Sequence, residues 1–150
     1  MTLNKRNLVE QITQTVESRL AGLKKSIAEI QESANEETKS AAGDKYETGR
    51  AMAHLEIEKL QAQQAELARS MEILRLVDSS QHHELIQLGS VVQSSQGNFF
   101  LAVSVGEVVF DGRRYMSISL ASPLGTKLRG KKQGERIFIN SREFVIERVF

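Results

Sequence analysis

Apolar residues recur every three or four positions through the first half of the chain, which is the spacing of one face of an α-helix. Between Lys5 and about Glu32, and again between about Asp44 and Val77, the spacing becomes a seven-residue repeat. The repeat consists of Val9, Val16, Leu20, Leu23, Ile27 and Ile30, and then of Tyr46, Ala53, Ile57, Leu60, Leu67, Met71 and Leu74. Each stripe is too narrow to bury itself, so the two helices are predicted to pair as an antiparallel coiled-coil hairpin.

The apolar stripe almost vanishes between Gln31 and Ala51, where Tyr46 is the one large side chain. Gly43 provides a break between the two helices. Acidic residues outnumber basic ones in this stretch, which carries Glu32, Glu36, Glu37, Asp44 and Glu47 against Lys39, Lys45 and Arg50. The hairpin is therefore predicted to end in an acidic tip around residues 33–48 with little core. At about 1.5 Å per residue, each arm would extend roughly 40 Å.

From about Glu84 the hydrophobic pattern changes to a period of two, and turn residues become frequent, which indicates strands. The predicted strands are Leu85–Val92, Asn98–Val105, Glu107–Phe110, Tyr115–Leu120, Arg136–Asn140 and Phe144–Val149. The turns between them are expected at Gln96-Gly97, Asp111-Gly112 and Asn140-Ser141. The aromatic residues expected in the core of this region are Phe99, Phe100, Phe110, Phe138 and Phe144.

One segment inside the strand region has helical signals instead. Ser122 is a suitable N-cap, Pro123 suits the first helical position, and Gly130 would end a helix of at most two turns. The predicted fold class is therefore α+β, with a helical hairpin followed by a small β domain that contains one short helix. The predicted domain boundaries are 1–78 for the hairpin, 79–84 for a linker and 85–150 for the β domain.

Composition narrows the class of protein. A charged fraction of 26% and a hydrophobic fraction of 40% fit a folded protein, and a net charge of +1 gives no sign of a nucleic-acid coat protein. The absence of Cys excludes disulfide scaffolds, thiolate zinc sites and Cys nucleophiles. The charged N-terminal stretch has no apolar signal segment, and no window reaches the roughly 18 apolar residues of a membrane span. We therefore expect a cytoplasmic location and no membrane association.

Two charged groups of residues are candidate sites. Asp44 and Glu47 have the spacing of a capping box, in which Glu47 reaches back to the N-cap residue. Around the short helix, five basic residues are opposed only by Glu135; they are Lys127, Arg129, Lys131, Lys132 and Arg136. This cluster is either a solvated face or a contact for an acidic surface or nucleic acid. No aromatic residue that could stack on bases is interleaved with it.

The run from Ser122 to Glu135, which reads S-P-L-G followed by L-R-G-K-K-Q-G-E, resembles the C-terminal signature of the bacterial Gre transcript cleavage factors. In that family a Ser-Pro opens a short helix that ends in Gly-Lys, and Gly-Asp or Gly-Glu and two strands follow. The run Gly43-Asp44-Lys45-Tyr46-Glu47 is similar to the family's tip motif, a Gly-Asp followed three residues later by Glu. The resemblance covers essentially the whole chain and identifies it as a divergent member with an FKBP-like β domain.

The resemblance implies a factor that binds RNA polymerase and is not an enzyme by itself. The β domain would dock at the rim of the secondary channel, and the hairpin would pass through the channel toward the 3′ end of the nascent RNA. Candidate docking residues are Lys127, Arg129, Lys131 and Lys132. The free protein would be a monomer without a stably bound cofactor.

At the tip, the resemblance implies that Asp44 and Glu47 help to hold a Mg²⁺ ion shared with the polymerase, and a water, against the RNA phosphate. Such chemistry uses hard oxygen ligands, and Mg²⁺ takes one or two carboxylates from a given protein. The two carboxylates, three residues apart, would share one helix face. Further tip contacts would come from Lys45, Tyr46 and Arg50, although Tyr46 could equally pack against the first helix.

Three alternatives stay open. The tip continues Thr48-Gly49-Arg50, where the family usually carries Asn-Ala-Glu-Tyr-like residues, which favours a channel-binding regulator that inhibits or competes without cleavage. The β domain could be an FKBP-like prolyl isomerase or chaperone, although such a domain needs an aromatic-lined pocket and the chain has no Trp. The hairpins could also pair between chains in a structural module, which stable self-association would reveal.

Overall fold

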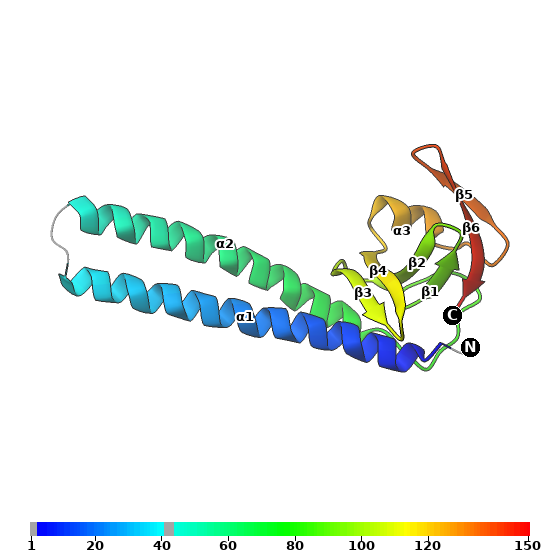
Figure 1. The fold of residues 1–150 in the computed structure, drawn as a ribbon, viewed down its shortest axis with the longest axis horizontal. Coiled ribbons are helices and arrows are strands. Elements are labelled where there is room, and N and C mark those ends of the chain that lie inside the picture. The colour runs from blue at the N-terminus through cyan, green and yellow to red at the C-terminus, as the bar shows by residue number, and fades with distance from the viewer. Residues whose placement is uncertain (1–2, 41–43) are drawn as a thin grey trace. The chain divides into compact units, whose positions relative to one another are not determined.

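The computed structural model describes residues 3–40 and 44–150, with side chains over 3–36 and 47–150. Two long helices, α1 over Lys5–Ser40 and α2 over Asp44–Arg75, precede a six-stranded mixed sheet (Figure 1). This arrangement confirms the predicted α+β fold class. By packing, the chain divides into one compact unit of Met1–Thr15 with Ser70–Phe150 and a second of Val16–Arg69. The FKBP-like character of the β domain and the domain boundaries at 78 and 84 stay predictions.

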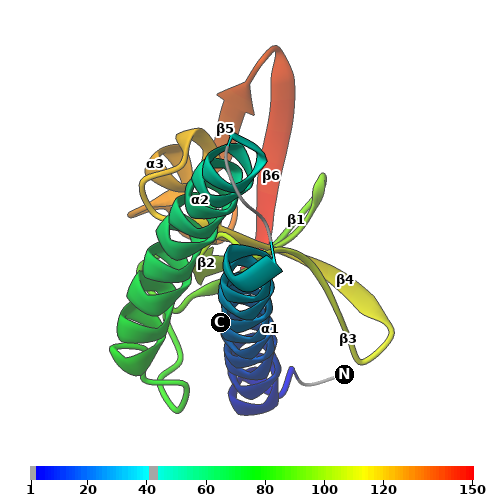
Figure 2. The ribbon, with the colours of Figure 1, turned by 90° about the vertical axis from the view of Figure 1, so that its left-hand side faces the viewer.

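The second unit contains the main part of the helical hairpin. Its two helices run antiparallel and lie side by side (Figures 1 and 2). Val16 and Ile27 are buried, and the other members of the stripe in this unit whose side chains are described are half-buried. These half-buried residues are Leu20, Leu23, Ile30, Ala53, Ile57, Leu60 and Leu67. The seven-residue repeat therefore places one thin apolar seam between the helices, as a coiled-coil pattern requires.

The first unit is built on six strands in the spatial order β3-β4-β2-β1-β6-β5. Their bounds are β1 Val91–Ser94, β2 Gly97–Ala102, β3 Gly106–Phe110, β4 Arg113–Ser119, β5 Arg136–Ile139 and β6 Arg142–Val149. Neighbouring strands are antiparallel except β2 and β4, which run parallel. Figure 2 shows β5 and β6 as a hairpin at one edge of the sheet.

Two of the predicted hairpin turns form tight loops of two residues. Asp111 and Gly112 join β3 to β4 with φ values of 51° and 74°, and Asn140 and Ser141 join β5 to β6 with φ values of 50° and 65°. Positive φ at both central residues is the conformation whose twist matches that of paired strands. The turn residues therefore fix the register of both hairpins.

The predicted strand Leu85–Val92 is wrong over its first six residues, because β1 begins only at Val91. Residues before it form a turn, in which the Ser90 hydroxyl accepts a hydrogen bond of 2.9 Å from the Gln87 N–H. Ile86 is nevertheless buried, and its main-chain groups bond to Gly130 and Lys131 at 2.8 Å each. The alternating pattern thus reflects burial in a turn held by hydrogen bonds.

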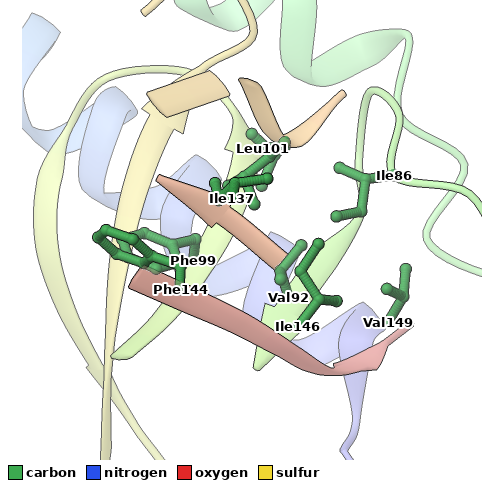
Figure 3. Close-up of a cluster of buried hydrophobic side chains, with 9 residues drawn as sticks. Ile86, Val92, Phe99, Leu101, Ile137, Phe144, Ile146 and Val149 are labelled. Carbon is green, nitrogen blue, oxygen red and sulfur yellow. The ribbon is translucent and has the colours of Figure 1, made fainter. Parts of the chain in front are cut away.

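The core of this unit lies on both faces of the sheet. On one face, Phe99 and Leu101 of β2 pack with residues of β5 and β6, including Phe144, and the Phe99 and Phe144 ring centroids are 6.2 Å apart (Figure 3). On the other face, Phe100 of β2 is fully buried. Adjacent residues of a strand face opposite ways, so β2 is covered on both sides.

The beginning of α1 also belongs to this unit. Asn4 accepts a hydrogen bond of 3.1 Å from the Asn7 N–H and so caps the helix. Leu8 and Ile12 are fully buried although neither lies on the seven-residue stripe. Gln11 donates a hydrogen bond of 2.7 Å to the carbonyl oxygen of Val109 in β3. The first turns therefore present a wider apolar face than a coiled coil needs, because they also pack within the β unit.

Candidate functional site

The end of the hairpin carries the predicted tip residues, and α2 begins there at Asp44. The side chains of Asp44, Lys45 and Tyr46 lie outside the described residues. Their predicted roles in capping, metal binding and tip contacts therefore stay predictions. Glu47 and Arg50 are described, and both are exposed on the first turns of α2.

A groove of about 1070 Å³ lies between α1 and α2 within the hairpin unit. Small side chains, Ala34 on α1 with Ala51 and Ala53 on α2, leave the space open. Glu47 and Arg50 line it with further polar residues, which are Gln31, Asn35, His54 and Gln61. Leu55 and Ile57 complete the lining, so the groove is a mixed polar and apolar surface feature next to the two described tip residues.

Glu47 fits the implied Mg²⁺ as a single ligand. Its carboxylate is exposed and offers the hard oxygen that this ion prefers. Within residues 3–36 and 47–150, no three His, Cys, Asp or Glu side chains come together as a metal-binding group. The described residues thus offer one exposed carboxylate for such an ion, and the metal site at the tip stays a prediction.

The second candidate site surrounds α3, over Pro123–Leu128. Ser122 caps this helix by accepting a hydrogen bond of 3.0 Å from the Gly125 N–H, while its hydroxyl donates one of 2.7 Å to the Ser119 carbonyl oxygen. Gly130, with a φ of 80°, turns the chain away after the helix. These contacts confirm the predicted short helix and set the direction of the basic residues that follow its first turn.

A hollow of about 520 Å³ lies between α3 and β5. We call it the basic hollow, and its lining residues are Thr126, Lys127, Arg129, Lys131, Arg136, Ile137 and Phe138. The Lys127 Nζ donates a hydrogen bond of 2.7 Å to the Phe138 carbonyl oxygen, and an Arg136 guanidinium nitrogen lies 3.0 Å from a Glu143 carboxylate oxygen. Arg129 and Lys131 have no carboxylate at ion-pair distance among the described side chains.

The structure brings together three of the four predicted docking residues, Lys127, Arg129 and Lys131. Lys132 does not line the basic hollow. Its main-chain N–H donates a hydrogen bond of 2.7 Å to the Glu135 carboxylate. This bond helps to turn the chain from the helix into β5.

The prediction that Phe138 belongs to the core is wrong, because 59% of its surface is exposed. Its neighbour Ile137 is buried and Ile139 is half-buried, so the alternation of β5 directs Phe138 outward. The basic cluster thus has an aromatic neighbour that is absent from its own stretch of sequence. The period-two pattern of β5 was the signal that could have placed Phe138 on the outer face.

No protein-family model matches the chain. No curated protein matches it either. The chain is similar to a solved structure described as that of the transcription factor Gfh1, at 24% identity over 99% of this chain and 95% of that one, with a TM-score of 0.34. At this TM-score the likeness carries no weight for family or function.

Membrane insertion by a helix has no support in the described ranges 3–40 and 44–150. Neither long helix, nor the short one, is long and apolar enough there to cross a membrane.

Proposed function

We propose that this chain binds bacterial RNA polymerase at the secondary channel and modulates elongation. The helical hairpin enters the channel, and the β domain docks at its rim. Asp44 and Glu47 at the hairpin end stimulate cleavage of backtracked RNA by the polymerase. The chain acts as an accessory factor and contributes metal ligands to the active site of the polymerase.

The observation that carries this proposal is the order of elements along the chain. Helices of 36 and 32 residues come first, and a β domain with a Ser-Pro-capped short helix follows. The sequence block from Ser122 to Glu135, whose resemblance to the Gre factors is given above, falls on that helix and the turn into β5. A thin seam that leaves Glu47 and Arg50 exposed near its end suits an arm that works inside a partner better than one that builds its own core.

The chemistry of the tip follows from its residue types. Bound Mg²⁺ would polarise the phosphate and its water, as in two-metal phosphoryl chemistry. Glu47 would hold the ion from one side through a carboxylate oxygen, and Asp44 would offer a second oxygen from the start of the same helix. Arg50, exposed one turn further on, would face the negative charge of the RNA.

The deciding experiment is transcript cleavage in a stalled, backtracked elongation complex. Wild type is compared with the Asp44→Ala/Glu47→Ala double variant, and with Glu56→Ala as a control that removes an exposed carboxylate elsewhere on α2. We expect wild type and the control to shorten the RNA from its 3′ end, and the double variant to bind polymerase without doing so. If no variant binds polymerase, the proposed function is wrong.

A regulator that occludes the channel without cleavage is the second candidate function. The sequence after Glu47, which runs Thr48-Gly49-Arg50, favours it because an exposed arginine replaces the acidic continuation usual in the family. In the same assay this function predicts that wild type and the double variant both bind and neither cleaves. Slower RNA extension upon addition of either protein would then identify the regulator.

A further inference from the structure

The outer face of β5 combines positive charge with an exposed aromatic ring. Arg136 and Phe138 are two residues apart in the strand and therefore point to the same side, away from buried Ile137. A single exposed phenylalanine would be ordinary on a protein surface. Here it lines the basic hollow together with Lys127, Arg129 and Lys131 from α3 and the turn after it.

The positive charge of the basic hollow is largely unneutralised. Among the described residues, only Arg136 of its four cations has a carboxylate at ion-pair distance, which is Glu143 at 3.0 Å. Lys127 donates to a carbonyl oxygen, which satisfies one N–H and leaves the charge in place. Like charges held close together repel, and a negative partner would remove that cost.

The basic hollow is also preformed. The Lys127 bond joins α3 to the Phe138 main chain across 11 residues of sequence. The Arg136–Glu143 pair joins β5 to β6, and Phe138 lies directly opposite Glu143 in the strand register. A partner would therefore meet a surface whose strand and helix are already fixed, which lowers the entropy cost of binding.

We propose that the basic hollow docks an acidic segment of a partner protein, with its carboxylates facing Lys127, Arg129 and Lys131 and one apolar side chain packed on Phe138. This inference deepens the proposed function and rests on it, since the partner there is RNA polymerase. An aromatic anchor beside charged contacts is the usual composition of the residues that dominate protein interfaces. Charge complementarity selects the acidic segment and orients it.

The observations favour a protein segment over a nucleic acid. Glu143 pairs with Arg136 at 3.0 Å, which takes one of the four cations of the basic hollow out of any contact with a phosphate backbone. One phenylalanine can receive one apolar side chain, whereas single-stranded nucleic acid is bound by stacking of successive bases along a basic groove. Lys132 does not line the basic hollow, and the four cations that do are too short a row for a phosphate track.

The first test uses peptide probes and the full chain labelled with ¹⁵N. A short peptide with glutamates around a central phenylalanine is titrated, next to the same peptide with serine at the centre and to a thymidine oligonucleotide of equal charge. We expect the phenylalanine peptide to shift the amide signals of residues 126–138 and to bind at least about fivefold more tightly than the serine peptide. Equal shifts with the oligonucleotide, or none with any probe, would overturn the inference.

Variants identify the contributing side chains. We expect Phe138→Ala to abolish the advantage of the phenylalanine peptide, and Arg129→Glu/Lys131→Glu to reduce binding of both peptides at least about tenfold. Arg113→Glu/Arg114→Glu is the matched control, because it also reverses two exposed charges, on β4, near the opposite edge of the sheet. A loss of binding in this control equal to that in the double variant would show that only net charge matters, and would contradict the inference.

A binding experiment with polymerase distinguishes failure of the inference from failure of the proposed function. Purified polymerase is incubated with labelled wild type and with the same variants, and bound protein is measured. Weakened binding of Phe138→Ala and the double variant, with the control unchanged, supports the inference. If wild type binds polymerase and every variant binds equally well, the basic hollow is not the docking surface, and the proposed function still stands. If wild type does not bind polymerase, the proposed function itself is wrong.

Discussion

The Nζ atom of Lys127 donates a hydrogen bond of 2.7 Å to the main-chain carbonyl oxygen of Phe138. That carbonyl belongs to β5, which ends the sheet and, within the described residues, pairs with β6 alone. An edge strand presents unpaired main-chain groups that proteins satisfy or shield. One lysine thus satisfies a strand edge, ties it to α3 and leaves its own charge at the surface.

We expect Lys127→Met to lower the free energy of unfolding by about 0.5–1 kcal/mol, because it removes this hydrogen bond. Urea denaturation should show a lower midpoint and an unchanged slope. Lys132→Met is the control, since the hydrogen bond at that residue comes from its main-chain N–H and survives the substitution. An equal loss in both variants would mean that charge, and not the bond, sets the stability.

Gly125→Ala should destabilise the β unit severely. A Cβ atom at Gly125 would overlap the Ser119 carbonyl oxygen, and it would lie 2.9 Å from the Ser122 hydroxyl oxygen. Main-chain atoms cannot move aside cheaply, so we expect a loss of about 3 kcal/mol or more, or no folded protein. Circular dichroism against temperature would measure it.

Gly22→Ala is the matched substitution for that experiment. Gly22 is exposed in α1, and a Cβ atom there would meet no heavy atom within 4 Å. Alanine favours the helix over glycine by about 0.5–1 kcal/mol, so this variant should be more stable than wild type. Similar melting of both alanine variants would contradict the assigned packing of α3.

Local signals in the sequence were sufficient for several parts of the fold. The seven-residue stripe predicted the seam of the hairpin, and Ser122 with Pro123 predicted the start of α3. Asp111-Gly112 and Asn140-Ser141 predicted two turns. In each case the residues that decide the structure are neighbours in sequence, or repeat at the period of the element they form.

Other parts depended on contacts between distant segments. Main-chain bonds to residues 130 and 131 hold Ile86 in place, and no local pattern reveals them, so the alternation around it predicts a strand that does not form. Leu8 and Ile12 pack within the β unit and not along the hairpin stripe. Residue type predicts Phe138 in the core, whereas the period of β5 turns it outward. The basic hollow could therefore be predicted only as a charge cluster.

Acidification should destabilise the protein through His83. This side chain is buried, and its Nδ1 is hydrogen-bonded to the Ser90 hydroxyl at 2.7 Å. Burial lowers the pKa of His83, the charges of Lys5 and His82 lower it further, and Asp78 opposes them. The unfolded chain therefore binds a proton at His83 at a higher pH than the folded chain does, so the free energy of unfolding falls as the pH drops below about 6.5.

His83→Asn tests this, because asparagine keeps a polar atom near the position of Nδ1 and does not titrate. Unfolding by urea would be measured at about pH 7.5 and about pH 5. Wild type should lose more stability between these two values than the variant. Parallel losses would assign the acid sensitivity to other groups.

Raising the pH above about 8 should increase the free energy of unfolding through Lys5. Its side chain is 8% exposed, and its Nζ donates hydrogen bonds to the main-chain oxygens of Gln81 at 2.9 Å and Phe150 at 3.2 Å. Burial lowers the pKa of Lys5 from 10.5 to about 8, although the charge of Asp78 opposes the shift. Between these values the unfolded chain keeps the proton that the folded chain has lost, so the free energy of unfolding rises with pH.

The gain between about pH 8 and about pH 10 should be of the order of 2 kcal/mol at this residue. Lys5→Met keeps an unbranched apolar chain of similar length and removes the titration, so its stability should lack this rise. The difference between wild type and Lys5→Met across the pH series isolates the effect from other titrating groups. If the difference stays constant with pH, the Lys5 ammonium keeps its proton in the folded protein, and its two carbonyl acceptors stabilise the charge more than burial opposes it.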